Sequence, residues 1–294
     1  AFAPDAQAVV GTIGGITALL AALIAVTQND LKRILAYSTV SQLGLMFIAL
    51  GAGCGGDEIL PIAGISAMFH LFTHAFFKAL LFLGAGSVMH SMGNIIDIRQ
   101  FSGLRKVMPI THWTFLIASL ALAGIFPFSG FWSKDELIAV IGHAAEEGPY
   151  PRLFGWLQIT ALAASALTAF YIFRAYFLTF WGPEKFPKEA GHHPHESPPV
   201  MAYPLIILSI GAAFIGVAVG PTHYFFHFLS HAPGFHTEAP HMNPLVMLMG
   251  TLVGVGGAGA AWWVYMARPG IAAGWAKRFP GLYKMSLGKF YIDE

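Results

Sequence analysis

The hydrophobic residues of this 294-residue chain are gathered into long runs that short polar stretches separate. A helix needs about 20 predominantly apolar residues to cross a bilayer. Seven runs meet that length, and the pattern therefore predicts an all-α polytopic membrane protein with about seven transmembrane helices. The runs cover residues 8–27, 34–53, 61–89, 111–142, 153–181, 201–220 and 244–266.

The fourth run is interrupted by "GIFPFSGF", residues 124–131. Pro127 removes a backbone donor and the flanking glycines loosen the helix, so we expect two half-helices joined by a short extended stretch. Irregular backbone at membrane depth is tolerated only where it is buried in protein or lines a wet cavity. In transporters such a break often marks the path of the transported ion or substrate.

Basic loops alternate with loops that are poor in Lys and Arg. Of the 16 Lys and Arg, 12 follow the first, third, fifth and seventh runs, Arg152 follows the fourth, and three lie inside runs. The positive-inside rule then places the first residue outside and the last residue inside. Residues 182–200 are predicted to form a polar cytoplasmic loop, and residues 267–294 a cytoplasmic segment.

Composition excludes several other classes of protein. The chain is 56% hydrophobic and 11% charged, whereas soluble domains are about 25% charged. A net charge of +1 without a basic tract gives no sign of nucleic-acid binding. A single cysteine, Cys54, excludes an internal disulfide and any CxxC metal site. The tetrapeptide "GGDE", residues 55–58, occurs in the catalytic loop of cyclic-dinucleotide synthases, but no nucleotide-binding domain surrounds it here, and we reject that function. The loop histidines lack the close spacing of metal ligands, so we expect no metal.

The stretch "HLFTHAFFKALLFL", residues 70–83, carries His70, His74 and Lys78 at intervals of four. Such positions share one helical face and climb about 6 Å per step. Ionisable groups at membrane depth are costly and usually mark transport pathways, and histidine titrates near neutrality. We predict a proton relay with waters between its members. Two alternatives are histidines bonded to neighbouring helices and a zinc site, which would need further ligands.

The stretch "SGFWSKDE", residues 129–136, follows the helix break. Asp135 and Glu136 are predicted in the first turn of the second half-helix, where carboxylates suit the positive end of the helix dipole. Lys134 lies about 15 Å from the polar end near Glu146, too deep to reach the interface comfortably. We therefore predict a functional role for it in preference to snorkelling.

Two further polar features allow structural interpretations. The hydroxyl run of "NDLKRILAYSTVSQLG", residues 29–44, could bond neighbouring helices or wet a channel. Arg174 lies among aromatic residues near the inner end of its run, and we expect it to snorkel to the interface.

Four stretches together resemble the large antiporter-like subunit family of respiratory complex I, NADH-quinone oxidoreductase subunit L (chain 5 in mitochondria). They are "QNDLKRILAYSTVSQLG" (28–44), "MFHLFTHAFFKALLFLGAGSVMH" (68–90), "LAGIFPFSGFWSKDE" (122–136) and "KFYIDE" (289–294). The resemblance implies an antiporter-like fold that supplies the ninth to fifteenth of about sixteen helices. Residues 1–294 would thus be one transmembrane domain, incomplete at both ends. An upstream Glu–Lys pair and a lateral helix after residue 294 would be missing.

The resemblance also implies function and partners. In the family, residues matching His70, His74, Lys78 and Lys134, with Asp135 beside the last, lie on the proton path. Proton translocation would be coupled to NADH oxidation and quinone reduction in other subunits, which hold the FMN, iron–sulfur clusters and quinone; none is expected here. Partners would be the lipid bilayer and other membrane subunits, especially the adjacent antiporter-like one, in the bacterial cytoplasmic or mitochondrial inner membrane.

Two other functions remain open from the sequence. The same fold serves in multisubunit Na⁺/H⁺ antiporters and membrane-bound hydrogenases, which have similar lysines. A passive membrane scaffold is the third possibility, and it would tolerate Met or Leu at Lys78 and Lys134.

Overall fold

A computed structural model describes residues 3–190, 194–232 and 244–292, and within these residues the chain is helical with no strand longer than an isolated bridge. The helices are α1 (Pro4–Thr27), α2 (Leu31–Ala52), α3 (Ile59–Ser91), α4 (Pro109–Ala123), α5 (Ser129–Glu147), α6 (Pro151–Phe180), α7 (Pro199–Val219), α8 (Tyr224–Ser230), α9 (Pro244–Trp262), α10 (Ile271–Arg278) and α11 (Pro280–Leu287). Six of the described helices are long and apolar enough to cross a membrane. The pair α4 and α5 makes the seventh crossing, so the predicted count is confirmed.

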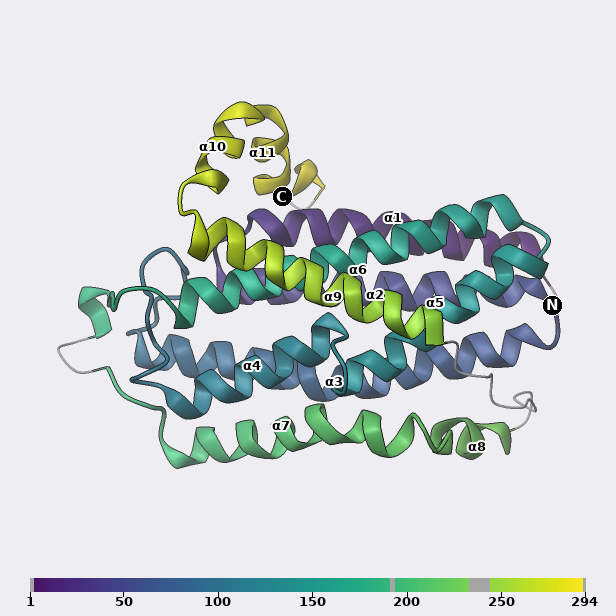
Figure 1. The fold of residues 1–294 in the computed structure, drawn as a ribbon, viewed down its shortest axis with the longest axis horizontal. Coiled ribbons are helices and arrows are strands. Elements are labelled where there is room, and N and C mark those ends of the chain that lie inside the picture. The colour runs from purple at the N-terminus through teal and green to yellow at the C-terminus, as the bar shows by residue number, and fades with distance from the viewer. Residues whose placement is uncertain (1–2, 191–193, 233–243, 293–294) are drawn as a thin grey trace.

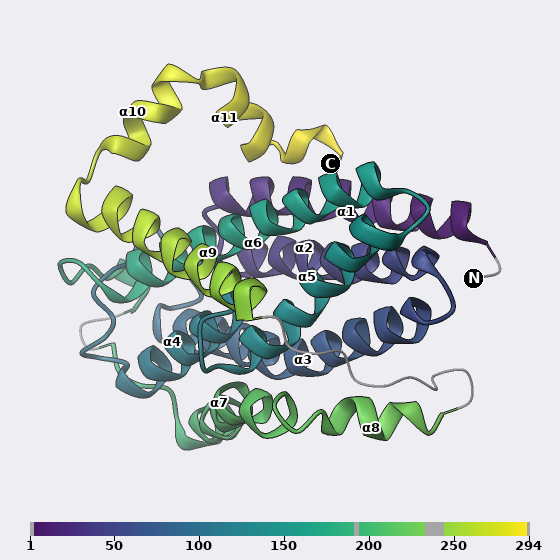
Figure 2. The same ribbon diagram turned by 45° about the vertical axis from the view of Figure 1, so that its right-hand side comes forward.

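The crossing helices form one elongated bundle with their axes along its length (Figure 1). Helices α2 and α5 each contact both α3 and α6, and these four helices surround the interior, while α1 packs along α2 and α6. Helix α7 covers α3 and α4 on one flank, and α9 covers α6 on another (Figure 2). Polar side chains of α2, α3, α5 and α6 can therefore meet inside the bundle, shielded from lipid.

The predicted helix break lies between α4 and α5. Gly124 ends α4 with a φ of +74°, a left-handed conformation that glycine adopts without strain. The N–H groups of Gly124 and Ile125 turn back to the carbonyls of Ala121 and Leu120, the pattern of a Schellman helix end. Helix α5 begins at Ser129.

The position of the acidic residues within α5 differs from the prediction. Because α5 begins at Ser129, directly after the break, its first turn contains no acidic residue. Asp135 and Glu136 are the seventh and eighth residues of the helix, so the prediction that they complement the helix dipole in the first turn was wrong. The helix starts several residues earlier than the charge pattern suggested.

The glycine-rich part of α9 packs closely against the broken helix and α6. A Cβ atom at Gly254 would lie 2.7 Å from the carbonyl oxygen of Ala123, and one at Gly257 would lie 2.6 Å from that of Ala166. Small residues permit such backbone approach between membrane helices. The small-residue stretch is thus a helix-packing surface.

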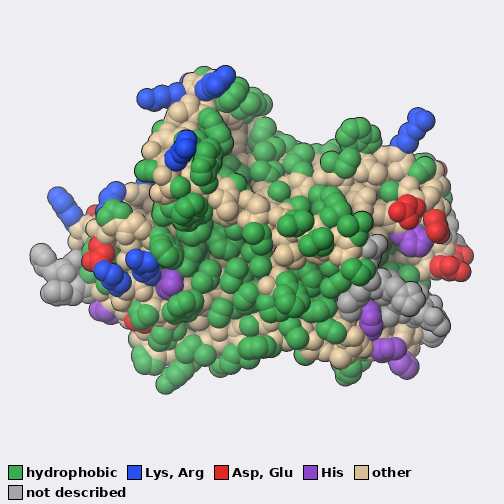
Figure 3. Space-filling view, viewed as in Figure 1, with side chains coloured by type: hydrophobic (Ala, Val, Ile, Leu, Met, Phe, Trp, Pro, Cys, Tyr) green, Lys and Arg blue, Asp and Glu red, His purple; other side chains and the backbone are tan. Residues whose placement is uncertain are grey.

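Lys and Arg side chains gather at one end of the bundle, around the loops that precede α2, α4 and α10 (Figure 3). We refer to this as the basic end. Residues 267–294, predicted to form a cytoplasmic segment, include α10 and α11. Helix α11 packs on the end of α1, where the Ser286 hydroxyl donates to the Leu23 carbonyl (2.7 Å) and lies 2.8 Å from Thr27 Oγ1.

Candidate functional site

Two buried lysines lie at the core of the bundle. Lys78, on α3, is 6% exposed, and Lys134, on α5, is 3% exposed. Neither of them forms an ion pair with a carboxylate among the residues that the structure describes. An ammonium group buried without a counter-ion is costly. Both side chains nevertheless have polar partners, and those partners differ in kind.

The ammonium of Lys78 reaches sideways from α3 to α2. It donates to Ser38 Oγ at 2.7 Å and, less closely, to the Leu35 carbonyl at 3.4 Å. The same Ser38 oxygen accepts a hydrogen bond from the Tyr171 hydroxyl of α6, also at 2.7 Å. Ser38 therefore joins Lys78 to a buried phenol on a third helix.

His70 is fully buried and uses both of its ring nitrogens. Nδ1 lies 2.9 Å from Ser133 Oγ of α5, and Nε2 lies 3.2 Å from Gln42 Oε1 of α2. The Gln42 amide nitrogen donates to Thr168 Oγ1 of α6 at 3.2 Å. Ser133 also lies 2.7 Å from Thr73 Oγ1. His70 thus connects α2 and α6 to the second half of the broken helix.

These contacts form one hydrogen-bonded series, because Tyr171 also reaches Thr168 Oγ1 at 3.3 Å. We name this series the polar row. In order along the contacts, its members are Lys78, Ser38, Tyr171, Thr168, Gln42, His70, Ser133 and Thr73. Side chains from α2, α3, α5 and α6 contribute to it, so all four central helices are needed to build it.

His74 lies beside the polar row without joining it. Its ring centroid is 6.1 Å from that of His70, and it meets Phe77 edge-on at 5.3 Å. Its Nε2 atom has no hydrogen-bond partner in the described part of the chain. The shared face of His70, His74 and Lys78 matches the predicted ladder. The direct connection between Lys78 and His70, however, runs through α2 and α6 and bypasses His74.

Lys134 is held by the backbone of the break. Its ammonium donates to the Leu122 carbonyl at 2.8 Å, an oxygen in the last turn of α4, where carbonyls have no intrahelical partner. Lys134 follows Ser133, which belongs to the polar row. One end of the polar row is therefore one residue along α5 from the second lysine, although within the described residues the Lys134 side chain makes no hydrogen bond to the row.

Asp135 points away from these groups toward α9. A Cβ atom at Gly250 would lie 2.3 Å from Asp135 Oδ1, so the carboxyl group packs directly on the α9 backbone. Asp135 is 7% exposed, and its Oδ2 atom has no hydrogen-bond partner within the described ranges. The structure brings His70, Lys78 and Lys134 together around the polar row, and it places Asp135 outside it.

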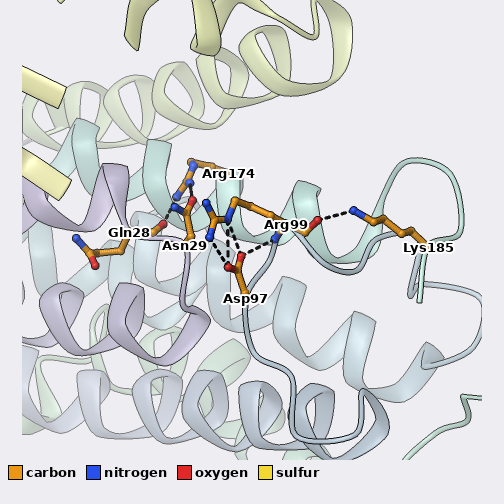
Figure 4. Close-up of polar contacts among 6 residues, drawn as sticks. All are labelled: Gln28, Asn29, Asp97, Arg99, Arg174 and Lys185. Carbon is orange, nitrogen blue, oxygen red and sulfur yellow. Dashed lines mark hydrogen bonds and ion pairs between the residues drawn. The ribbon is translucent and has the colours of Figure 1, made fainter. Parts of the chain in front are cut away.

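Arg174 belongs to a different polar cluster, at the basic end (Figure 4). Its guanidinium donates to the Gln28 carbonyl at 2.7 Å and to Asn29 Oδ1 at 3.0 Å, and it lies over the Tyr265 ring. At 6% exposure it is buried, so the expectation that it snorkels to the interface was wrong. It satisfies carbonyls at the end of α1 instead, within the predicted aromatic surroundings.

Four members of the polar row were not predicted from the sequence: Thr73 and Ser133, which lie within stretches singled out for other residues, and Thr168 and Tyr171. Thr168 and Tyr171 lie three residues apart on α6, on one helical face. That spacing was the available signal. No group of three or more His, Cys, Asp and Glu that could hold a metal ion occurs among the described residues.

The described residues form a bundle of membrane-spanning helices that holds two buried lysines, one of them beside a helix break. Comparison with known proteins assigns this bundle to the antiporter-like membrane fold. Residues 1–146 match the family model described as "NADH:quinone oxidoreductase/Mrp antiporter, TM". The Mrp complex structure from Dietzia sp. has a similar fold, with a TM-score of 0.65 and 22% identity over 92% of this chain and 30% of that chain.

Sequence relatives narrow this class. The chain is 41% identical to NAD(P)H-quinone oxidoreductase chain 5 of Picosynechococcus sp., covering 99% of this chain and 46% of that protein. It is also 41% identical to NADH-quinone oxidoreductase subunit L of Mycobacterium tuberculosis, covering 88% and 39%. The chain belongs to the family of NADH-quinone oxidoreductase subunit L and chain 5. It spans less than half the length of these relatives.

Proposed function

We propose that this chain forms part of a proton-translocating membrane subunit of an NADH:quinone oxidoreductase. The observation that carries the proposal is the polar row, a hydrogen-bonded series that leads from Lys78 to Ser133 beside Lys134. The relatives are named as subunits of such oxidoreductases. Partner subunits in the membrane are therefore expected, the adjacent antiporter-like subunit among them.

The hydroxyl, ammonium and imidazole groups at the two ends of the polar row suit proton transfer because most of them can both donate and accept. The Gln42 amide between these ends holds them in place and does not itself pass a proton. Hydroxyl and imidazole groups pass a proton by accepting it at one position and releasing it at another. Lys78 and Lys134 would act as the stations at which a proton is held. Their like charges repel, so loading one station favours release from the other.

The energy for translocation would come from outside this chain. Moving one proton against 100 mV requires about 2.3 kcal/mol. Quinone reduction by partner subunits would supply it, and those subunits would hold the FMN, iron–sulfur clusters and quinone. In this chain, Asp135 beside Lys134 could change its charge state, and His74 could take part if water joins its Nε2 atom to the polar row.

The decisive test replaces Lys78 with Ala in the complete protein, assembled in its complex and reconstituted in vesicles. We expect proton pumping per NADH to be abolished or strongly reduced while assembly is unchanged. The reason is that the variant lacks the amino group that holds the proton, so Ser38 and Tyr171 would have an apolar gap in place of their proton donor. Exposed Lys106 offers a control, since Lys106→Ala should pump normally. Unchanged proton stoichiometry in Lys78→Ala would refute the proposal and favour a passive scaffold.

The alternative function is Na⁺/H⁺ exchange, because the matched family model includes Mrp antiporters. The same vesicles separate the two. Pumping that depends on Na⁺ and is lost in its absence would favour exchange, and pumping that is independent of Na⁺ would favour proton translocation.

A further inference from the structure

We propose that Gln42 and Thr168 hold His70 in the tautomer that carries its proton on Nε2, so that Nδ1 is the nitrogen that exchanges protons with Ser133 of α5. This inference rests on the proposed function, since it assigns a direction of proton exchange within the polar row. It follows from counting the donors and acceptors around Thr168, Gln42 and His70.

The hydroxyl proton of Thr168 is committed to its own helix. Thr168 Oγ1 donates to the Ala164 carbonyl at 2.7 Å, and a carbonyl oxygen can only accept. Toward its other neighbours Thr168 Oγ1 is therefore an acceptor. It accepts from Gln42 Nε2 at 3.2 Å, whereas the single proton of the Tyr171 hydroxyl, 3.3 Å away, goes to the closer Ser38 Oγ at 2.7 Å.

This arrangement fixes the orientation of the Gln42 amide. Its nitrogen must face Thr168, because the threonine oxygen needs a donor there, and its oxygen consequently faces His70 Nε2 at 3.2 Å. An amide oxygen only accepts, so His70 Nε2 must carry a proton. In the neutral imidazole the other nitrogen, Nδ1, is then an acceptor.

The α5 side of His70 is complementary to that tautomer. Ser133 Oγ lies 2.9 Å from Nδ1 and can donate to it. Thr73 Oγ1, 2.7 Å from Ser133 Oγ, can in turn donate to Ser133. The alternative acceptor for the Ser133 proton, the Ser129 carbonyl, is farther away at 3.5 Å.

The fixed donors and acceptors around His70 determine the side on which it can exchange protons. A carboxamide donates from nitrogen and accepts at oxygen, so Gln42 cannot pass a proton onward without changing its own bonding. The hydroxyl of Ser133 has no such restriction. His70 therefore gains and loses its mobile proton on the α5 side, next to Lys134, while Gln42 and Thr168 are positioning residues that act through His70.

The test combines a tautomer measurement with a pumping measurement on the complete protein in its complex. Solid-state ¹⁵N NMR of histidine-labelled complex in vesicles distinguishes protonated from unprotonated ring nitrogens, and the His70 signals are those lost in His70→Gln. We expect a protonated Nε2 and an unprotonated Nδ1. In Thr168→Val the Gln42 amide is free to turn, so both tautomers should appear and pumping per NADH should fall about tenfold, since a misplaced tautomer disables proton transfer.

Two variants separate positioning from mere packing. Thr168→Ser keeps the hydroxyl and should restore both the single tautomer and the pumping. Thr160→Val removes a hydroxyl that makes the same type of bond on α6, to the Trp156 carbonyl at 2.9 Å, but outside the polar row. It should leave both measurements unchanged.

The outcomes distinguish this inference from the proposed function. A parent protein with its proton on Nδ1 would overturn the inference and leave the pump intact. A Thr168→Val protein that loses pumping but keeps one tautomer would overturn the positioning role. Normal pumping in Lys78→Ala, with the Nε2–H tautomer present, would overturn the proposed function alone.

Discussion

Lys78 and Lys134 are both buried lysines, yet their hydrogen-bond acceptors differ in kind. Lys78 projects from the unbroken helix α3 and donates to a side-chain hydroxyl, Ser38. Lys134 projects from a helix that has just restarted after a break and donates to a backbone carbonyl, that of Leu122. The closest acceptor of Lys78 is thus a side-chain oxygen, which a substitution can remove, and the acceptor of Lys134 is a backbone oxygen, which a substitution cannot remove.

The difference teaches what each site can do. A hydroxyl can accept a proton and donate one, so the Lys78 site continues into further groups, beginning with Tyr171. A carbonyl can only accept, so the Leu122 oxygen stabilises Lys134 without offering an onward route. Side-chain substitutions should therefore affect Lys78 most, whereas substitutions that move the backbone should affect Lys134 most.

The largest effect is expected from Gly130→Ala, which should displace the backbone of α5 at the helix break. The added Cβ would lie 1.9 Å from the Ala121 carbonyl oxygen, so α5 must move away from α4. We expect a loss of about 1–3 kcal/mol in the free energy of unfolding, measured on the complete protein in detergent, together with loss of pumping. Gly86→Ala on α3 is the control, because its Cβ would meet no atom within 4 Å. Equal stability of the two variants would contradict this account of the Lys134 site.

A smaller effect, confined to pumping, is expected from Ser38→Ala. Lys78 then keeps only the Leu35 carbonyl at 3.4 Å, and Tyr171 loses its closest acceptor. We expect pumping per NADH to fall by up to about 30-fold, since two hydrogen bonds worth about 1 kcal/mol each are removed. Ser41→Ala, one turn along α2, removes a buried hydroxyl that bonds only the Ala18 carbonyl. If both variants lose pumping equally, the polar row has no special role for Ser38.

The smallest effect concerns the loop that positions α2 against α3. Backbone bonds join Leu31 to Ile96 and Ile98 to Asn29, and the neighbouring Arg99 guanidinium lowers the pKa of Asp97 from its ordinary 3.8 by hydrogen bonding. A carboxyl whose pKa is lowered by folding stabilises the fold above its unfolded pKa, and this contribution disappears as the pH falls through its folded pKa.

Asp97→Asn should therefore lower stability near neutral pH by no more than about 1 kcal/mol, because the Arg99 partner is largely exposed. The difference from the parent should vanish below the folded pKa of Asp97. Thermal unfolding of both proteins across this pH range is the measurement. A loss that persists unchanged in acid would show that the carboxyl charge is not its cause.

The sequence predicted well those features that depend on one segment at a time. Apolar run lengths gave the seven crossings, and Pro127 with its flanking glycines gave the break. Spacing by four placed His70 and Lys78 on one face of α3. Short helices such as α8 and α10 were not predicted, because segments of seven or eight residues leave little periodicity to detect.

The sequence could not predict contacts that join different segments. Periodicity says which side chains share a face, but it does not say which helix covers that face. Thr168 and Tyr171 lie 126 and 133 residues from their partners Gln42 and Ser38, and only the packing of α6 against α2 brings them together. Arg174 was misjudged for the same reason, because its acceptors lie in the loop after α1.

The packing of α11 on the end of α1 has a consequence for the order in which the helices of this chain come together. Thr27 and Ser286 are 259 residues apart in the chain, whereas α1 and α2 are sequential neighbours. Contacts between distant residues form late, because a long loop must be closed first. During synthesis the α1 end of the bundle therefore stays uncovered by α11 until residue 286 has been made, and the Thr27–Ser286 contact forms after the contacts between α1 and α2.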